Sequence, residues 1–322
     1  MEYRAVASAE ADVQPVVGEL SIAVRGSRLS LRHKEALAGY IFILPAVLGF
    51  ILWTAGPMLY SLWLSFHSWN LVQSPKWIGL GNFREMWNDR IFWTSVRATL
   101  TYAAILVPLF QLLSFAMALL LNTKIPGIGF FRAAFYLPVV VPVAAASFLW
   151  GFIFNSEFGL LNYVLRELGF DKILWFQEPR YAMAAMVIMS LWLFGGTMVI
   201  YLAALQGVPE HLYEAAALDG ASALRRLFVV TIPMMSPVIF FNFVLGVIGA
   251  LQIFTQAYII TDGGPQNATR FYSLMIYQKG FRDFQMGYAA ALAWVLFAFI
   301  LLLSLLVFRS LGKMVYYEEE GR

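Results

Sequence analysis

Residues 227–261 read LFVVTIPMMSPVIFFNFVLGVIGALQIFTQAYIIT and contain no Asp, Glu, Lys or Arg. A helix needs about 20 mostly apolar residues to cross the hydrocarbon core of a bilayer, and this run is long enough. A charge at the centre of such a helix costs about 2.5 to 3.5 kcal/mol on insertion scales. The stretch therefore predicts a membrane-spanning helix.

Other stretches of the chain lack charge in the same way. Hydrophobic residues make up 61% of the 322 residues and charged residues only 13%, which is far from the soluble norm. The charge-free stretches are 36–75, 98–123, 133–156, 181–209, 227–261 and 284–308. The first could hold two spans, but Gly, Pro and polar residues fill its second half and favour one, over about 38–66. We expect an all-α, polytopic membrane protein with six transmembrane helices.

Basic residues flank the first and last predicted spans, and they orient the chain. They are Arg25, Arg28, Arg32 and Lys34 before the first span, and Arg309 and Lys313 after the last. Lys and Arg favour the cytoplasmic side, so both termini are expected there. The expected organisation is a flexible cytoplasmic extension (1–35), a transmembrane domain (36–309) and a cytoplasmic tail (310–322).

This orientation places 208–233, between spans four and five, in the cytoplasm. Pro209 suits the first position of a helix, and Gly220 suits a left-handed cap at its end. Ser222 can then cap a second helix, which enters span five near Pro233. The segment predicts a short helix, a sharp turn and a second helix.

The sequence of the short helix has two interpretations. Residues 214–220 read EAAALDG. Glu214 offers a carboxylate beside the small residues Ala215 and Ala216, which would allow a partner protein to approach closely. The alternative is an amphipathic helix at the membrane surface whose glutamate is simply solvated.

The spacing of this segment resembles a known signature. EAAALDG is followed by nine residues, 221–229, and then by VTIP, which ends at Pro233. EAAxxxG, nine residues and IxLP form the cytoplasmic signature of binding-protein-dependent ABC importer permeases. Val230 and Ile232 replace the usual Ile and Leu.

The resemblance extends over nearly the whole chain from about Glu35. It is to the carbohydrate-uptake branch, which includes maltose and glycerol-phosphate transporter permeases. The matching stretches are Leu44-Pro45, 78–83 (IGLGNF), Phe131-Arg132 through Leu137-Pro138, Phe154-Asn155, 158–162 (FGLLN), 260–265 (ITDGGP) and 287–292 (GYAAAL).

The resemblance implies how such a protein is powered. The helix over 209–219 would be a coupling helix, which sits in a cleft of a separate nucleotide-binding subunit. The residues expected to couple to the ATPase are Glu214, Ala215, Ala216, Asp219, Gly220 and Pro233. The chain lacks GxxxxGK[ST], so it cannot bind ATP through a P-loop, and ATP and Mg would be bound by the ATPase subunit.

The resemblance also implies the setting and the partners. The expected location is the bacterial inner cell membrane, and the partners are ABC ATPase subunits, a second homologous permease, an extracytoplasmic solute-binding protein and the lipid bilayer. Nucleic acid is not expected. The chain would act as a non-catalytic subunit, with no cofactor of its own.

The charge-free spans bear on the solute. A pathway without charge must bind through hydroxyls, amides, backbone and aromatic faces, which suits a neutral sugar or oligosaccharide. The candidates are Ser190, Trp192 and Thr197 in span four and Asn242, Gln252, Gln256 and Tyr258 in span five. Each could instead bond a neighbouring helix.

The resemblance leaves the solute open. Polyols and glycerol phosphate esters belong to the same branch and are the alternative substrates, although a phosphate is less expected without a basic residue in a span. Gly246, Gly249 and Ala250 stand where the family would have asparagine and aromatic contacts. This departure implies either a wider site or a solute held mainly by the partner permease.

Two other classes of membrane protein fit less well. An ion-coupled secondary transporter normally needs a carboxylate in the membrane, and no predicted span contains Asp or Glu. A membrane enzyme needs a catalytic constellation, yet His33, His67 and His211 lie outside the spans or at their edge, without metal-ligand spacing. Cysteine is absent, which excludes thiol chemistry. We expect neither catalytic residues nor a metal site.

Overall fold

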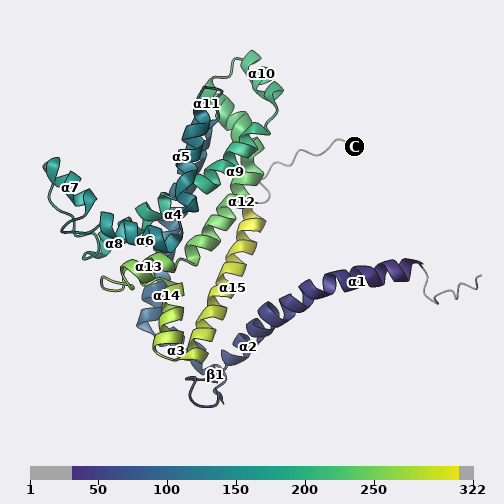
Figure 1. Cartoon of the computed structure of the whole chain (residues 1–322), viewed down its shortest axis with the longest axis vertical. Helices are drawn as coiled ribbons and strands as arrows, with labels where there is room; N and C mark the ends of the chain where they lie inside the picture. The colour runs from purple at the N-terminus through teal and green to yellow at the C-terminus, as the bar shows by residue number, and fades with distance from the viewer. Residues whose placement is uncertain (1–30, 312–322) are drawn as a thin grey trace, which may run out of the picture. The chain divides into compact units, whose positions relative to one another are not determined.

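The computed structural model describes residues 31–311, and most of these are helical. The chain divides into two compact units, one ending at Pro57 and the other beginning at Met58. In the first unit, α1 (Leu31–Phe50) leads through a π-helical turn, η1 (Ile51–Ala55), into the start of α2 (Gly56–Leu64) (Figure 1). Residues 31–35 of the predicted flexible extension are therefore helical, and the rest of it lies outside the described residues.

The second unit holds most of the elements. They are β1 (His67–Ser68), β2 (Lys76–Trp77), α3 (Gly81–Asn88), α4 (Arg90–Leu121), α5 (Ile128–Val140), α6 (Val143–Ile153), α7 (Leu160–Glu167), α8 (Pro179–Leu191), α9 (Gly195–Gln206), α10 (Glu210–Leu218), α11 (Ala223–Arg226), η2 (Leu227–Thr231), α12 (Ile232–Leu251), α13 (Thr255–Ile260), α14 (Tyr272–Tyr277), η3 (Gln278–Arg282) and α15 (Met286–Leu311). The two short strands pair antiparallel, with His67 opposite Trp77. The predicted all-α class does not include this small sheet.

The helices long and apolar enough to span a membrane agree with the charge-free stretches. Four segments meet this test among the described residues: Arg32–Leu64, Arg90–Leu121, Ala223–Ile260 and Met286–Ser310. The predicted spans over 133–156 and 181–209 are instead bent helix pairs, α5 with α6 at 98° and α8 with α9 at 45°. The count reaches six if each bent pair is one span.

A proline accounts for the first bend, and a close contact between helices accompanies the second. Pro142 follows α5, and the residue before a proline is pushed out of the helical region. Val141 accordingly adopts φ −73° and ψ 125°, and α6 starts afresh after Pro142. At the second bend, Gly195 lies against the backbone carbonyl of Phe135, where a Cβ atom would collide. Glycine thus lets the start of α9 pack directly on α5.

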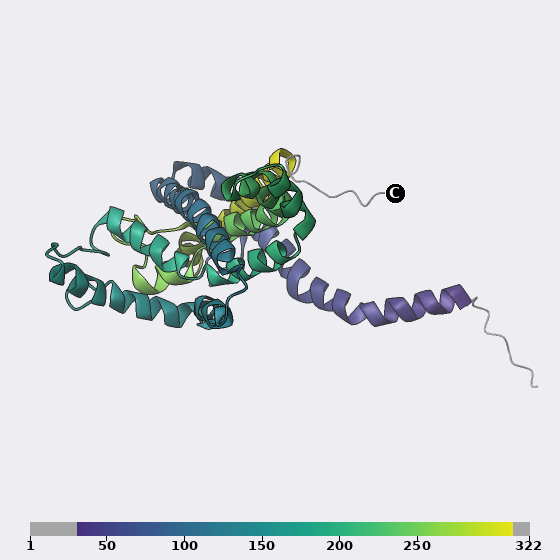
Figure 2. The same cartoon turned by 90° about the horizontal axis from the view of Figure 1, so that it is seen from above.

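Helix α4 organises the packing of the second unit. It contacts α8, α9, α12 and α14, and α12 packs against both α4 and α15 (Figure 1; Figure 2). The largest buried cluster includes Tyr102 of α4, Met186 of α8, Leu251 of α12 and Phe271. Figure 1 shows α10 and α11 at one end of this unit and β1 and α3 at the other. The predicted coupling helix, α10, therefore lies at the end of this unit opposite to β1 and α3.

Candidate functional site

Helix α10 has well-defined ends. Pro209 is its N-cap, with φ −60° and ψ 129°, so the prediction that Pro209 is the first helical residue is wrong by one position. At the other end, the Gly220 N–H donates to the Ala217 carbonyl (3.0 Å) and the Ala221 N–H to the Ala216 carbonyl (2.9 Å). These bonds form a Schellman motif, which needs a left-handed residue. Gly220 supplies it with φ +76°, which confirms the predicted cap.

The predicted coupling residues of α10 lie on its accessible surface. Glu214, Ala215, Asp219 and Gly220 are exposed, and Ala216 is half-buried. Leu218 beside them is 90% exposed. Within the described residues, this helix presents Glu214 among small side chains and Leu218, with Glu210 and His211 exposed in its first turn.

Helix α10 is tied to the helix that follows it. The Tyr213 hydroxyl lies 3.1 Å from the Thr231 hydroxyl on η2. Ser222 caps α11 by accepting a hydrogen bond from the Arg225 N–H (3.4 Å), as predicted. From Ala223 the chain passes through α11, η2 and α12 as one helical segment. Helix α10 is thus connected to the predicted fifth span both along the chain and by a side-chain hydrogen bond.

Pro233 lies inside this segment, close to Thr231. A proline cannot donate a backbone hydrogen bond, and it crowds the preceding turn. Here the turn before it is widened, since the Ile232 N–H bonds the Leu227 carbonyl five residues back. A π-helical turn thus accommodates Pro233. The continuous helical segment begins before this proline, at Ala223.

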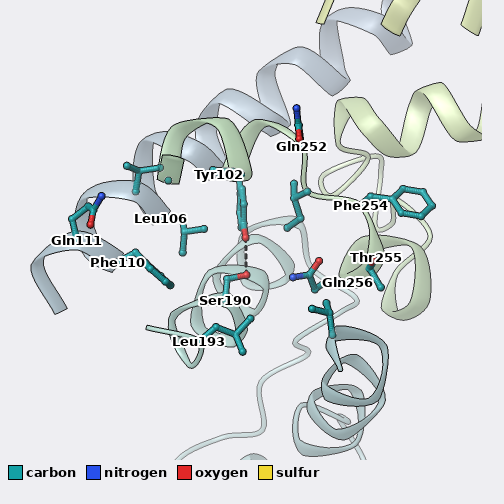
Figure 3. Close-up of a pocket in the computed structure, with 16 residues that line it drawn as sticks. Tyr102, Leu106, Phe110, Gln111, Ser190, Leu193, Gln252, Phe254, Thr255 and Gln256 are labelled. Carbon is teal, nitrogen blue, oxygen red and sulfur yellow. Dashed lines mark hydrogen bonds between the residues drawn. The ribbon is translucent and has the colours of Figure 1, made fainter. Parts of the chain in front are cut away.

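A cavity of about 420 Å³ lies among α4, α6, α8, α12 and α13 (Figure 3). No charged side chain lines it in the part of the chain that the structure describes. Its lining residues are Tyr102, Leu106, Val107, Phe110, Gln111, Val143, Ser190, Leu193, Gly246, Gly249, Ala250, Gln252, Ile253, Phe254, Thr255 and Gln256. The wall is thus mainly apolar, with hydroxyl and amide groups set into it.

The predicted fifth span is broken where it lines this cavity. Helix α12 ends at Leu251, and α13 begins at Thr255 after three non-α-helical residues, of which Phe254 has φ −141° and ψ −62°. Irregular backbone at membrane depth is tolerated where it is buried in protein or lines a cavity. Broken helices are also where many transporters hold their solutes. The charge-free pattern of 227–261 gave no sign of this break.

Two polar groups of the cavity are hydrogen-bonded to each other, and a third bonds a residue outside the lining. The Ser190 hydroxyl donates to the Met186 carbonyl (2.9 Å), so the buried Tyr102 hydroxyl, 2.6 Å away, donates to Ser190. The Gln111 Oε1 accepts from the Tyr201 hydroxyl at 2.8 Å. In Figure 3 the amide of Gln256 reaches toward Ser190, whereas that of Gln252 points away from it. The cavity can therefore present hydroxyls and amides to a polar solute.

The structure separates the predicted pathway residues into two groups. Ser190, Gln252 and Gln256 line the cavity, whereas Trp192, Thr197, Asn242 and Tyr258 do not. Trp192 packs edge-on against Trp150, with ring centroids 5.8 Å apart. The Asn242 amide donates to the Val238 carbonyl of its own helix (2.9 Å), so this bond is neither to a solute nor to a neighbouring helix, the two outcomes that the sequence left open. Tyr258 stacks on Phe254 of the cavity lining but does not itself line the cavity.

Sequence reasoning missed the contribution of α4 to the cavity. Tyr102, Phe110 and Gln111 line it, but no residue of 98–123 was among the predicted pathway residues. A signal was present, because Gln111 is the one amide side chain deep inside that charge-free stretch. Phe254 and Thr255 were also missed, since their place depends on the break after α12.

The small residues of α12 leave space in the cavity. Gly246, Gly249 and Ala250 all line it, and a Cβ atom at Gly249 would meet nothing within 4 Å. A Cβ at Gly246 would lie 3.5 Å from the Gln111 amide nitrogen, which is ordinary contact. These positions suit the wider site that the sequence suggested.

A cavity lined by a broken helix near the middle of the membrane spans is typical of transporters. Here it is combined with an exposed helix, α10, at one end of the unit. The family model of the binding-protein-dependent transport system inner membrane component matches residues 112–315, and the chain belongs to that family. It is a multi-pass inner membrane permease of an ABC transporter, as the resemblance indicated.

Curated relatives match most of the chain. A probable ABC transporter permease protein of Bacillus subtilis, YesP, is 42% identical, covering 95% of this chain and 99% of its own length. The lactose transport system permease protein LacF of Rhizobium radiobacter is 34% identical, over 88% and 96%. The trehalose/maltose transport system permease protein MalF of Thermococcus litoralis is 32% identical, also over 88% and 96%.

A solved structure shows the same fold. A chain of a bacterial alginate ABC transporter, in complex with an alginate pentasaccharide-bound periplasmic protein, superposes with a TM-score of 0.79. The match covers 88% of this chain and 96% of that one at 20% identity. This likeness supports the helical architecture described above.

Proposed function

We propose that this chain is a transmembrane subunit of an ATP-driven importer for a sugar or oligosaccharide. A separate ATPase subunit binds ATP with Mg and hydrolyses it, and an extracytoplasmic binding protein delivers the solute. The names of the lactose and trehalose/maltose relatives support the solute class. One coupling helix per chain requires a second, homologous permease for the second ATPase subunit.

The observation that carries this proposal is the link between α10 and the cavity. Tyr213 joins α10 to Thr231, and the helical segment that contains Thr231 continues to Gly246 and Gly249 in the cavity wall. Reversing a 1:99 population of two states takes about 5.5 kcal/mol of differential binding. If α10 is firmly docked on the ATPase subunit, it can supply this free energy to the cavity through the continuous helix. A loosely docked α10 cannot. ATP-driven movement of α10 would thereby switch the side from which the cavity is open.

The cavity supports a polyhydroxylated solute. Hydroxyls of a sugar can exchange hydrogen bonds with the Gln256 amide and the Ser190 hydroxyl, and its apolar ring faces can pack on Phe110. A carboxylate or ammonium group would find no partner of opposite charge in this lining. Whatever part of the solute occupies this cavity should therefore be uncharged.

The proposal includes an orientation. With six spans, both termini and α10 lie in the cytoplasm, where ATPase subunits are found. The loops at the opposite end, which include β1 and α3, then face the binding protein (Figure 1).

Variants of α10 test the coupling. Glu214→Ala removes the central carboxylate of the exposed surface, and Gly220→Pro breaks the Schellman motif, since proline cannot adopt a positive φ. We expect both variants to insert in the membrane but to uncouple ATP hydrolysis from uptake. Membrane level, co-purification of the ATPase subunit, ATPase activity and saccharide uptake are measured together.

The matched control is Glu167→Ala, which removes an exposed carboxylate from α7, away from α10 (Figure 1). It should leave ATP hydrolysis coupled to uptake. Normal uptake and normal coupling in both α10 variants would show that this helix does not couple the chain to an ATPase.

A further inference from the structure

A second cavity, of about 230 Å³, lies beyond the end of α13 and is rich in charge. Its lining residues are Ile91, Asp262, Arg270, Met275, Gln278, Lys279, Arg282 and Asp283. Three of these side chains are basic and two are acidic. This cavity lies outside the predicted spans, so its charges do not conflict with the charge-free stretches.

Two of the basic side chains are already paired. Arg282 Nη1 donates to Asp262 Oδ2 at 2.5 Å, and Lys279 Nζ lies 3.1 Å from Asp283 Oδ2. The hydrogen bond from Arg282 lowers the pKa of the Asp262 carboxyl, with a smaller contribution from the Gln278 amide. Asp262 therefore stays ionised and neutralises Arg282.

Arg270 is left without such a partner. Its guanidinium makes no hydrogen bond to any residue between 31 and 311, and its Nε atom is shielded from solvent. Arg270 is only partly exposed, so a cation held here without a hydrogen-bond acceptor is destabilising, and a bound anion offsets that cost. Asp262 interacts with Arg270 only through space, since both carboxylates pair directly with other cations, and the lining carries one positive charge in excess.

The loop after α13 holds this guanidinium in place. Gly263 has φ +94°, and a Cβ atom there would lie 3.3 Å from the Arg270 Nε. Glycine is required on both counts, because other residues disfavour this φ and because the backbone packs on the arginine. The arginine is thus positioned by its surroundings, which reduces the entropy lost when it binds a ligand.

Aromatic rings connect this cavity with the larger one. Phe254, which lines the larger cavity, stacks on Tyr258 with centroids 5.3 Å apart. Tyr258 meets Tyr277 at 5.1 Å, and Tyr277 stacks on Phe281 at 5.4 Å. The Arg282 guanidinium lies over Tyr258, 5.5 Å from its centroid. The two cavities thus share one aromatic cluster, and aromatic rings suit the apolar faces of pyranoses.

We propose that the Arg270 cavity binds the anionic group of an acidic saccharide, whose neutral part occupies the larger cavity. The inference rests on the proposed import of a saccharide and specifies its class. An arginine guanidinium recognises a carboxylate through paired, charge-assisted hydrogen bonds. The charge of the solute is thus recognised outside the spans.

Binding of defined probes to the purified full-length chain, assembled with its partner subunits in lipid nanodiscs, tests this inference. The probes are cellobiouronate, which has one uronate residue and one neutral glucose residue, the neutral disaccharide cellobiose and glycerol 3-phosphate. We expect cellobiouronate to bind more tightly than cellobiose. Arg270→Gln should weaken cellobiouronate binding about tenfold or more, the usual value of a charge-assisted hydrogen bond, and leave cellobiose unaffected.

Two further variants keep the result interpretable. Arg270→Lys retains the charge and should retain part of the cellobiouronate binding, which separates loss of the cation from misfolding of the loop. Arg166→Gln removes an exposed cation of α7 and should change nothing. Equal affinity for the acidic and neutral disaccharides, or full cellobiouronate binding by Arg270→Gln, overturns the inference. Tighter binding of glycerol 3-phosphate than of cellobiouronate overturns the assignment to a saccharide.

Uptake by cells separates this inference from the proposed function. If the importer accumulates cellobiose but excludes cellobiouronate, the acidic class is wrong and saccharide import stands. If the complete importer accumulates neither disaccharide and the chain binds neither, both proposals fail.

Discussion

The Tyr213 hydroxyl lies 3.1 Å from the Thr231 hydroxyl, and this hydrogen bond joins the exposed helix α10 to the helical segment that reaches the cavity. Thr231 is buried, whereas α10 presents most of its surface outward. The bond thus connects a surface suited to docking with the interior of the protein.

Removal of this hydrogen bond should weaken coupling without unfolding the protein. A neutral hydrogen bond contributes about 0.5 to 1.5 kcal/mol, so Tyr213→Phe should reduce uptake per ATP hydrolysed by about two- to tenfold. Thr231→Val should have a similar effect. Since both changes remove the same bond, the double variant should be no worse than either single one. Fully additive losses would show that the two hydroxyls act independently. Tyr163→Phe, on an exposed tyrosine of α7, is the control.

Filling the cavity at Gly249 should block the solute but leave the chain assembled. A Cβ at this position meets nothing within 4 Å, so the side chain of Gly249→Leu can extend into the cavity of about 420 Å³. Saccharide binding and uptake should fall sharply, while co-purification of the ATPase subunit is retained. Gly249→Ala, which adds one methyl group, should have a much smaller effect. Unchanged uptake in the leucine variant would place the solute elsewhere.

The pair formed by Tyr102 and Ser190 predicts an asymmetric effect on stability. Ser190→Ala leaves the buried Tyr102 hydroxyl without its partner, at a cost of about 1 to 3 kcal/mol. Tyr102→Phe costs less, because Ser190 still donates to the Met186 carbonyl. Adding Tyr102→Phe to Ser190→Ala should therefore raise the thermal unfolding midpoint in detergent. A lower midpoint in the double variant would contradict the assigned direction of the bond.

Acid should loosen the loop around Asp262. The hydrogen bond from Arg282 lowers the pKa of the Asp262 carboxyl, with smaller contributions from Gln278 and Arg270. A carboxyl with a lowered pKa in the folded state stabilises it above its unfolded pKa, about 3.9, and loses that contribution as the pH falls through the folded value. Hydrogen exchange at residues 262–283 should therefore show lower protection below about pH 4. Asp262→Asn should be less protected at neutral pH and should lack this pH-dependent step.

Local features of the sequence predicted the caps between α10 and α11 well. The left-handed Gly220 after α10 and the N-cap Ser222 of α11 were both expected and both observed, because capping depends on residues within one turn. Pro209 was misplaced by one position, which is the usual uncertainty of a helix boundary. The widened turn before Pro233 was not expected, since its hydrogen bonds involve backbone groups that any residue carries.

The residues of the cavity were predicted only in part. Polarity selected Ser190, Gln252 and Gln256, which line the cavity, but it selected Trp192 and Asn242 equally, and these pack on Trp150 or bond within their own helix. A polar residue in a span can bond its own helix, a neighbour or a solute, and periodicity does not distinguish these outcomes.

The sequence by itself determined that the chain crosses a membrane, where it crosses, and where a short capped helix interrupts the spans. These are local properties, since the cost of a charge in hydrocarbon and the preference of a cap depend on a few neighbouring residues. The tertiary structure decided the rest. It bends two of the predicted spans, breaks the fifth beside the cavity, and brings Tyr102 to Ser190, 88 positions away in the chain. It also places Arg270 beside two ion pairs in which, among residues 31–311, it takes no part, because which charges meet depends on how distant segments pack.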